Sequence, residues 1–128
     1  TSIQDGLLWA RHNIFNPATA GGPRRGAFHS LIVADMDGDG DIDVVTAEME
    51  GVPGDCPPRT YIYENVDGRG ITWREHVILD AGLGCHALVA GDVTGNGKLD
   101  ILGKPWRASP DNAVDGSMFV VFLENVSD

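Results

Sequence analysis

Short runs of apolar residues, separated by turns rich in glycine, proline and aspartate, extend along most of the chain. Runs of about four to eight residues that are rich in Val, Ile, Leu and Tyr and bounded by such turns are typical of β-strands. No segment keeps a helical period over about ten residues, and "LLWARHNIF" is brief and ends at Asn16-Pro17. The pattern therefore predicts an all-β chain.

An internal repeat orders these segments. The motif W-x-x-H-x-I occurs at residues 9–14 and again at 73–78. "FHSLIVADMDGDGDIDVV" from Phe28 matches "CHALVAGDVTGNGKLDIL" from Cys85, and "YIYENV" at 61–66 matches "VFLENV" at 121–126. The offsets are 64, 57 and 60 residues. Because three blocks match in one order, we infer a tandem repeat of about 60 residues.

Each unit contains strand-like segments, here termed A to D. They fall at residues 29–34, 42–48, 60–65 and 72–79 in the first unit and at 86–91, 99–104 and 118–124 in the second. Residues 9–14 predict an outermost D strand that precedes the first unit and completes the last blade of its own chain or of an adjacent copy. Repeated four-stranded antiparallel units are the blades of a β-propeller. We therefore predict one domain over 1–128, with blade one at about 29–79 and blade two at about 86–128, the latter completed by a D strand like 9–14.

The first A–B loop, in "ADMDGDGDIDVV", carries five aspartates within nine residues. Two carboxylates ~4 Å apart repel by roughly 4 kcal/mol at an effective dielectric near 20, so something must offset the charge. A calcium ion takes six to eight oxygens. The loop offers oxygens at alternate positions, and its glycines suit a tight turn with positive φ. The predicted ligands are the side chains of Asp35, Asp37, Asp39 and Asp43 and the carbonyl of Asp41.

Two rival loops do not fit this stretch. An EF-hand needs Glu at its twelfth position, which here is Thr46, and a helix after the loop, where "IDVVTAEME" has the pattern of a strand. A dockerin repeat also needs a following helix. The remaining alternative is an acidic turn that binds no ion.

The D-x-D-G-D-G-x-x-D loop between two strands resembles the FG-GAP (VCBS-type) repeat of integrin-like calcium-binding β-propellers, twice and over nearly the whole chain. The resemblance implies a structural Ca²⁺ in each A–B loop. In the second loop it implies as ligands Asp92, Thr94, Asn96, the carbonyl of Lys98 and Asp100. Neutral oxygens at 94 and 96, together with the Lys98 side chain, predict a weaker second site that is empty or holds sodium or water.

Propellers of this family usually have six to eight blades, whereas this chain has two. Two blades alone would leave apolar faces exposed. We therefore expect several copies to assemble into a ring, or the rest of a longer chain to supply the other blades.

The B–C and D–A loops are expected on the opposite end of the blades from the calcium loops, where loops on a rigid scaffold commonly bind ligands. The predicted ligand-binding group at this end is His29, His86, Lys104, Trp106 and Arg107. An aromatic face with several hydrogen-bond donors suits a sugar or an acidic polysaccharide. Alternatively the two histidines hold a divalent metal, or are core residues placed by the repeat. His12 and His76 are expected to pack or to bond neighbouring blades, and Trp9 and Trp73 to lie between blades.

Charge and composition exclude some classes of function. The net charge is −10, with 14 Asp against 5 Glu, which makes binding to a phosphate backbone a poor prediction. No apolar run approaches the ~18 residues that cross a bilayer, so we expect no membrane insertion. The start "TSIQDG" lacks the pattern of a signal peptide, which indicates a mature, excised or intracellular form. The family resemblance implies an extracellular or periplasmic location.

The two cysteines, Cys56 and Cys85, fall in loops predicted at the same end of the blades. A disulfide between them would close about 30 residues and contribute roughly 3–4 kcal/mol by loop-entropy estimates. The alternative is that Cys85, at the start of an inner strand, is a buried thiol.

Two classes of function follow from these features. The first is a calcium-binding interaction module that recognises carbohydrate or protein. The second is the propeller part of a carbohydrate-active enzyme, of the polysaccharide lyase or sugar dehydratase type, with His29, His86, Lys104 and Glu48 as acid–base candidates. The sequence has no nucleophile elbow, phosphate loop or paired catalytic carboxylates, so the enzymatic alternative rests on the resemblance.

Overall fold

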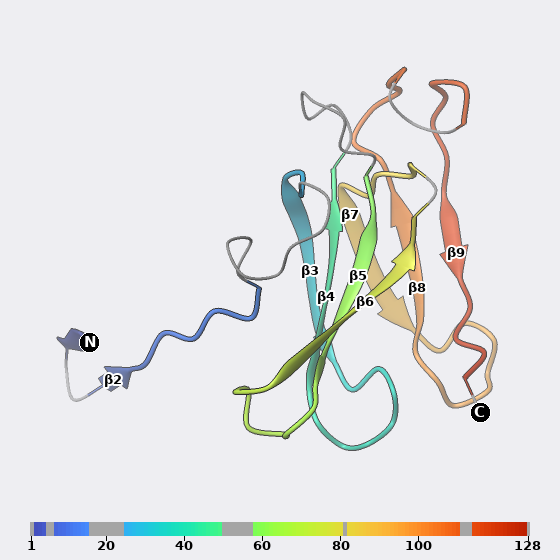
Figure 1. The fold of residues 1–128 in the computed structure, drawn as a ribbon. Helices are drawn as coiled ribbons and strands as arrows, with labels where there is room; N and C mark the ends of the chain where they lie inside the picture. Colours follow the sequence, from blue (N-terminus) through green and yellow to red (C-terminus); the bar gives the residue numbers. More distant parts are fainter. Residues whose placement is uncertain are drawn as a thin grey trace.

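The structure is a computed structural model that describes residues 2–4, 7–15, 25–49, 58–80, 82–110 and 114–127. Within these residues the chain forms nine β-strands and no helix, so the all-β prediction is confirmed (Figure 1). The strands are β1 (Ser2–Gln4), β2 (Leu7–Trp9), β3 (Phe28–Ala34), β4 (Asp43–Glu48), β5 (Thr60–Asn65), β6 (Trp73–Leu79), β7 (Ala87–Gly91), β8 (Asp100–Lys104) and β9 (Val121–Leu123). In the described part of the chain, no helix is long and apolar enough to cross a membrane.

The first unit forms one four-stranded antiparallel sheet, here called sheet 1, in the order β3-β4-β5-β6. Its strands coincide with the four predicted segments to within one residue at each end. Strands β4 and β5 are the central pair, and their residues are mostly buried because both faces of the sheet are partly covered. The local prediction of this unit is therefore confirmed.

The second unit forms sheet 2, which has three antiparallel strands in the order β7-β8-β9. β9 covers only Val121–Leu123, whereas the prediction was 118–124. Pairing between β8 and β9 stops at Gly103 and Val121. Two residues further on, Pro105 has no N–H to donate, so the ladder does not continue.

The N-terminal segment differs from the prediction of a D strand at residues 9–14. β2 ends at Trp9 and pairs antiparallel with β1 in a two-stranded hairpin, and residues 10–15 form no strand. A strand needs a partner to satisfy its N–H and C=O groups. Figure 1 shows the hairpin on the far side of sheet 1 from β9, so these residues do not meet the outer edge of β9 in their own chain.

The two sheets pack against each other through a small apolar core. Its buried centre is Met36, Val45 and Ile101. Partly buried side chains from both sheets surround this centre: Ile32, Ala34, Ile62, Ile78, Leu88, Leu99 and Leu123. Removal of this apolar area from water is what holds the two repeats side by side.

Polar bonds tie the inner strands of the two sheets as well. The Ser30 hydroxyl donates to the carbonyl of His86 over 2.7 Å, and the Cys85 N–H donates to the carbonyl of Glu48 over 3.2 Å. At the opposite end, the Asn125 amide donates to the carbonyl of Met36 over 3.0 Å. The two repeats are thus joined at both ends of their strands.

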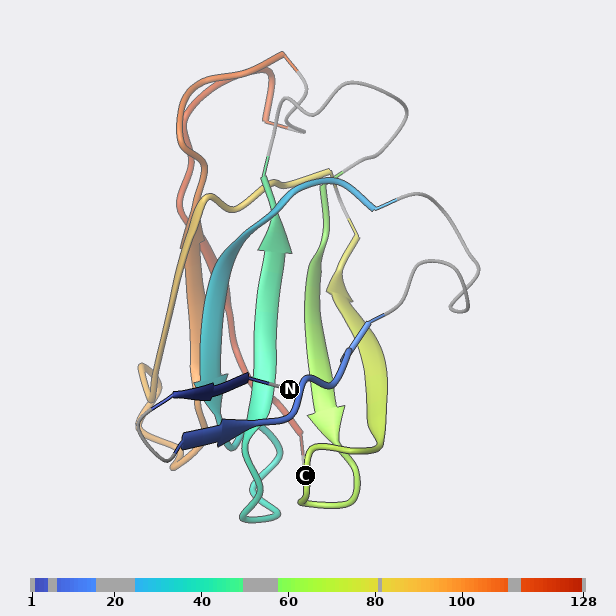
Figure 2. The ribbon, with the colours of Figure 1, turned by 90° about the vertical axis from the view of Figure 1, so that its left-hand side faces the viewer.

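The turns between β3 and β4, between β5 and β6 and between β7 and β8 all lie at the lower end of the molecule in Figure 1. Figure 2 shows the same arrangement from the side of β3. This agrees with the predicted sorting of the A–B and C–D turns onto one end, because antiparallel strands alternate in direction.

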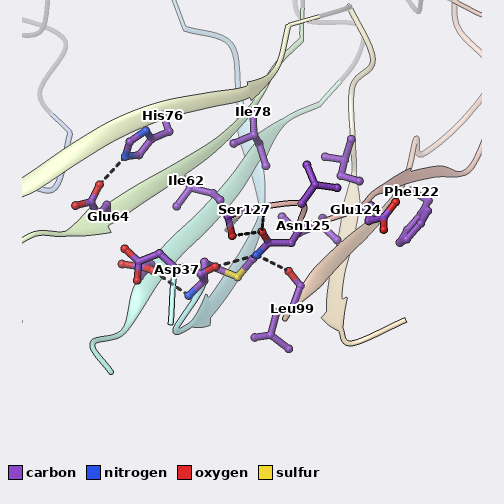
Figure 3. Close-up of a pocket in the computed structure, with 15 residues that line it drawn as sticks. Asp37, Ile62, Glu64, His76, Ile78, Leu99, Phe122, Glu124, Asn125 and Ser127 are labelled. Carbon is purple, nitrogen blue, oxygen red and sulfur yellow. Dashed lines mark hydrogen bonds and ion pairs between the residues drawn. The ribbon is translucent and has the colours of Figure 1, made fainter. Parts of the chain in front are cut away.

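A groove of about 590 Å³ opens between the two sheets beside β9 (Figure 3). Its apolar walls include Ile62 and Ile78 from sheet 1 and Leu123 from sheet 2, and acidic side chains such as Asp37 and Glu64 lie at its end. In sheet 1 the equivalent position beside β5 is filled by β6, whereas in sheet 2 no described strand lies beside the outer edge of β9.

Candidate metal loops and histidine–tryptophan cluster

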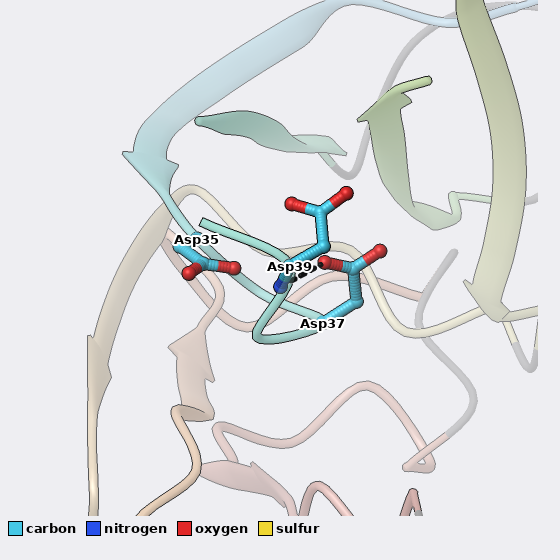
Figure 4. Close-up of side chains that lie close together, drawn as sticks. All are labelled: Asp35, Asp37 and Asp39. Atoms are coloured by element: carbon cyan, nitrogen blue, oxygen red, sulfur yellow. Dashed lines mark hydrogen bonds between the residues drawn. The ribbon is translucent and has the colours of Figure 1, made fainter. Parts of the chain in front are cut away.

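The loop between β3 and β4 brings together three of the predicted metal ligands. Asp35, Asp37 and Asp39 each offer a carboxylate oxygen, and these oxygens lie within 4.8 Å of one another (Figure 4). Oxygens that bind one calcium ion at about 2.3–2.6 Å lie no more than about 5 Å apart. The three carboxylates therefore fit one hard cation.

The chain itself sets the shape of this loop. Asp35 accepts N–H groups from Gly38 over 2.7 Å and from Gly40 over 3.0 Å. Both glycines have positive φ, 83° and 96°, as expected for the tight turn. Asp37 and Asp39 each accept the N–H of the residue two further on, over 3.1 and 2.8 Å. The second of these donors is Asp41, so the predicted carbonyl ligand follows directly in the same turn.

Asp43, the last predicted ligand of this loop, is buried and anchors the loop to the sheet. Its two carboxylate oxygens accept the N–H of Met36 over 3.0 Å and the N–H of Asn65 over 2.9 Å. Each carboxylate oxygen has two lone pairs, so these bonds leave acceptor capacity. Asp43 therefore joins the loop to β5 whether or not it also contacts an ion.

The loop between β7 and β8 repeats this scaffold. Asp92 accepts N–H groups from Gly95, Asn96 and Gly97 over 2.7 to 3.1 Å. The Asn96 amide oxygen accepts the N–H of Lys98 over 2.9 Å, in the position that Asp39 and Asp41 occupy in the first loop. The two loops thus share a backbone framework and differ in the charge of their side chains.

Asp100 takes the place of Asp43 in the second loop. It is fully buried and accepts the N–H of Asn125 over 2.8 Å and that of Val93 over 2.9 Å, and the Thr94 hydroxyl lies 3.4 Å from it. These N–H bonds, that from Asn125 foremost, lower the pKa of the Asp100 carboxyl. Asp100 is therefore held in its ionised form by the chain alone.

In the first loop the pKa of one carboxyl shifts in the other direction. Desolvation raises the pKa of Asp37, and repulsion from the neighbouring Asp39 and Asp43 carboxylates raises it further. Carboxylates that disfavour each other's ionisation gain most from a bound cation. The first loop is thus the better candidate for binding a divalent ion.

Two asparagines that connect these loops to the next strand were not predicted from the sequence. Asn65 and Asn125 each donate a backbone N–H to the buried aspartate of their own unit, Asp43 or Asp100. Their amide oxygens accept N–H groups from Gly70 and Ser127. The signal was present, because both asparagines lie in the repeated E-N-V block.

At the opposite end of the strands, four of the five predicted ligand-binding residues form a chain of ring and cation contacts. The imidazole rings of His29 and His86 stack with centroids 3.6 Å apart. His86 stacks in turn on the indole of Trp106 at 5.8 Å, and the Arg107 guanidinium lies over that indole at 5.2 Å. We call these four residues the histidine–tryptophan cluster.

The fifth residue, Lys104, is tied to the cluster through the backbone. Lys104 ends β8, and its carbonyl accepts the N–H of His86 over 2.9 Å. The Lys104 side chain is exposed, and Trp106 is 56% exposed. The cluster therefore presents an aromatic face and cationic groups to solvent.

Glu48, the fourth acid–base candidate, is enclosed in sheet 1. The residue is 1% exposed, and its carboxylate accepts the N–H of Gly26, the N–H of Arg59 over 3.0 Å and the hydroxyl of Tyr61 over 3.0 Å. A carboxylate with three donors and no access to solvent satisfies a buried structural network.

The remaining predicted residues fall as follows. His76 in β6 lies 2.6 Å from the Glu64 carboxylate. The half-buried Trp73 donates its indole N–H to the carbonyl of Gly70, whereas Trp9 and His12 are exposed. Cys56 lies outside the described residues, so its pairing with the buried Cys85 stays a prediction.

Two side-by-side antiparallel sheets, each with an aspartate- and glycine-rich loop after its first strand, define the class of the protein as a tandem β-repeat protein. A family model described as FG-GAP-like repeat matches residues 35–103, more than half of the chain. The chain belongs to this family, whose repeats are typical of β-propeller-like interaction modules. Searches of curated proteins and of solved structures give no significant match.

Proposed function

We propose that this chain is a calcium-stabilised interaction module of a β-propeller. The observation that carries the proposal is the convergence of the Asp35, Asp37 and Asp39 carboxylates in the first loop. A bound Ca²⁺ would neutralise these carboxylates and link the loop to the sheet edge. The residues that would hold it are those three, with Asp43 and the Asp41 carbonyl. The second loop would bind more weakly, through Asp92, Thr94, Asn96, the carbonyl of Lys98 and Asp100.

The proposed ligand site is the histidine–tryptophan cluster, and the proposed ligand class is carbohydrate, in particular acidic sugars. Sugar rings stack on aromatic faces, and hydroxyl and carboxylate groups accept hydrogen bonds from imidazole, ammonium and guanidinium groups. The exposed indole of Trp106 and the cations Arg107 and Lys104 supply both kinds of contact. A protein partner with an acidic patch is the other ligand that this chemistry fits.

The proposed partners also include further propeller blades. Apolar side chains on the outward faces of both sheets are exposed, among them Leu31 on sheet 1 and Val89 on sheet 2. In repeat proteins, exposed apolar faces of this kind are normally covered by neighbouring repeat units. We propose that a second copy of the chain, or the rest of a longer chain, covers them. The net charge of −10 argues against nucleic acid as a partner. We place the protein outside the cell or in the periplasm, where the FG-GAP-like repeats typically occur.

One observation favours a second candidate function, the propeller part of a carbohydrate-active enzyme. His29 and His86 lie in direct contact beside the end of β8, where Lys104 is exposed. Imidazole and ammonium groups can move protons at a uronate or a sugar hydroxyl. In this alternative, those three residues would be the acid–base groups of a polysaccharide lyase or sugar dehydratase.

A glycan array with and without EDTA tests the proposed function. We expect binding of acidic glycans that is lost in W106A and weakened by EDTA. An activity screen on uronate polymers separates the two candidates, since turnover that disappears in H29A and H86A supports the enzyme. Absence of both glycan binding and turnover would overturn the carbohydrate proposal. Titration calorimetry with Ca²⁺ tests calcium binding by the two loops independently.

A further inference from the structure

We infer that the two metal loops are energetically coupled through Asn125, so that Ca²⁺ bound to the first loop raises the affinity of the second. The inference rests on the proposed function, since it requires both loops to bind the ion, and it adds how the two loops depend on each other. It starts from the position of Asn125, which follows β9 and bonds residues of both loops. Figure 3 shows the bonds of its side chain, among them that to the carbonyl of Leu99.

The backbone of Asn125 holds two of the proposed ligands of the second loop. Its N–H donates to the Asp100 carboxylate over 2.8 Å, and its carbonyl accepts the side-chain amide of Asn96 over 3.3 Å. The Asn96 amide oxygen accepts the N–H of Lys98 over 2.9 Å. Because only the NH₂ end of the amide donates, these two neighbours together fix its orientation. Asn125 is therefore a positioning residue for Asn96 and Asp100.

The side chain of Asn125 reaches the first loop. Its amide donates to the carbonyl of Met36 over 3.0 Å. Met36 lies between the proposed ligands Asp35 and Asp37 in the sequence, and its N–H donates to a third, Asp43, over 3.0 Å. One residue of the second unit thus bonds the backbone between the ligands of the first loop.

Apolar packing keeps the same parts of the two loops adjacent. Met36 is 6% exposed and forms the buried centre of the core together with Val45 and Ile101, and Leu99 packs against this centre. Leu99 and Ile101 are the sequence neighbours of Asp100. Because a close-packed interior transmits small displacements, a shift of one loop changes the packing of the residues that flank a ligand in the other.

The charge of the first loop gives the coupling its sign. The carboxylates of Asp35, Asp37 and Asp39 lie within 4.8 Å of one another, so in the ion-free chain they repel and favour separation. A cation shared by the three would draw them together and order the turn that contains Met36. The Met36 carbonyl would then be held in place as the acceptor for Asn125.

The ordering of Asn125 is a cost that the two loops share. The first loop needs its amide at Met36, and the second needs its backbone at Asp100 and Asn96. The loss of conformational entropy is incurred once, by whichever loop binds first, so the other loop binds more tightly. Repulsion between two bound cations acts in the opposite direction, but it is weakened at about 0.15 M salt, where the Debye length is about 8 Å.

NMR titration of the 128-residue chain with CaCl₂ tests the inference, because each loop carries glycine amides that report on it alone. The reporters are Gly38 and Gly40 in the first loop and Gly95 and Gly97 in the second. D37N removes one carboxylate from the first loop. We expect it to raise the Kd of the second loop at least about fivefold, the lower end of usual coupling between sites. D67N removes a charge from the β5–β6 turn and should leave that Kd unchanged.

N125A tests whether the coupling passes through Asn125. The substitution removes the amide that bonds Met36 and keeps the backbone N–H and carbonyl that contact the second loop. In the N125A background we expect D37N to change the Kd of the second loop less than about twofold. S127A is the matched control, since the Ser127 hydroxyl donates to the amide oxygen of the same side chain, and it should keep the fivefold effect. The comparison of D37N with D67N carries the test even if N125A folds poorly.

The outcomes separate this inference from the proposed function. Equal effects of D37N and D67N on the second loop, tighter binding by the second loop in D37N, or a D37N effect that persists in N125A would overturn the coupling and leave calcium binding intact. Shifts confined to the first loop up to about 10 mM Ca²⁺, above the Kd of weak extracellular calcium sites, would overturn it as well. Absence of shifts at both loops would overturn the proposed calcium binding together with the inference.

Discussion

The imidazoles of His29 and His86 stack with centroids 3.6 Å apart, and the Nδ1 of His29 lies 2.9 Å from the carbonyl oxygen of His86. The two residues occupy the same position in successive repeats. Because a carbonyl only accepts, the Nδ1 of His29 carries the proton in this contact. The repeat therefore places equivalent rings from adjacent sheets in contact and fixes the tautomer of one of them.

The first prediction concerns ligand binding at the histidine–tryptophan cluster. R107A should weaken binding of an acidic glycan by about tenfold, because the guanidinium over Trp106 supplies charge-assisted hydrogen bonds. Titration calorimetry with the best ligand from the array measures the change. R69A is the matched control, since Arg69 is an exposed arginine in the β5–β6 turn at the other end of the strands. Equal losses in the two variants would refute a role for the cluster.

The second prediction concerns calcium. Titration of the chain should give two unequal sites, and D37N should remove the tighter one, because it takes a carboxylate from the only acidic triad among the described residues. At a free Ca²⁺ concentration of about 100 Kd, binding should add about 2.7 kcal/mol to the free energy of unfolding.

The control for the calcium prediction is D67N. Asp67 lies in the β5–β6 turn at the same end of the molecule and accepts N–H groups from Arg69 and Ile71. D67N should leave both calcium affinities unchanged. Two sites of equal affinity in the unaltered chain would contradict the prediction that the first loop binds calcium more tightly than the second.

The third prediction concerns the bond between the repeats. N125A should lower the free energy of unfolding by about 1–3 kcal/mol, because the Asn125 amide bonds the carbonyls of Met36 and Leu99 and the substitution leaves these acceptors unpaired. Urea denaturation measures the loss. S127A removes only an exposed hydroxyl that donates to the same side chain and should cost less than about 0.5 kcal/mol.

The fourth prediction concerns the buried carboxylate of Glu48. E48A should destabilise the fold by at least about 3 kcal/mol, since it leaves the N–H groups of Gly26 and Arg59 and the hydroxyl of Tyr61 without an acceptor. E48Q keeps one acceptor oxygen and should lose less. Thermal denaturation compares the two variants, and equal melting temperatures would count against the network.

The fifth prediction concerns acid stability. The hydrogen bond from His76, aided by Arg74, lowers the pKa of Glu64 below its usual 4.5. A lowered folded-state pKa gives stability that is complete above the unfolded pKa and is lost as the pH falls through the folded one. The unaltered chain should therefore exceed E64Q in stability by a constant amount, under about 1 kcal/mol for a partly exposed pair, above about pH 5. The difference should shrink below pH 4.5. If the stability difference between the unaltered chain and E64Q grew as the pH fell, the pKa of Glu64 would be raised on folding and the prediction would be wrong.

Local features of the fold were readable from the sequence because they depend on nearby residues. Short apolar runs bounded by turns placed β3 to β8 to within one residue, and the aspartate–glycine spacing placed the first metal loop. Residues 9–14, predicted as a D strand, form no strand after Trp9. Their pattern indicates only that they suit a sheet edge, whereas the position of the segment depends on tertiary contacts such as the packing of Phe15 against Phe28 and Tyr63.

The sequence by itself determined the repeat, strands β3 to β8 and the alternate carboxylates of the first loop, since each follows from the pattern of nearby residues. Only the tertiary structure decided that Glu48 is enclosed, that Asn125 bonds the loop of the other repeat, and that His29 meets His86. These contacts join residues 11 to 89 positions apart, such as Arg59 with Glu48 and Met36 with Asn125. Their formation depends on which faces of the two sheets are removed from water together, and no local pattern encodes that choice.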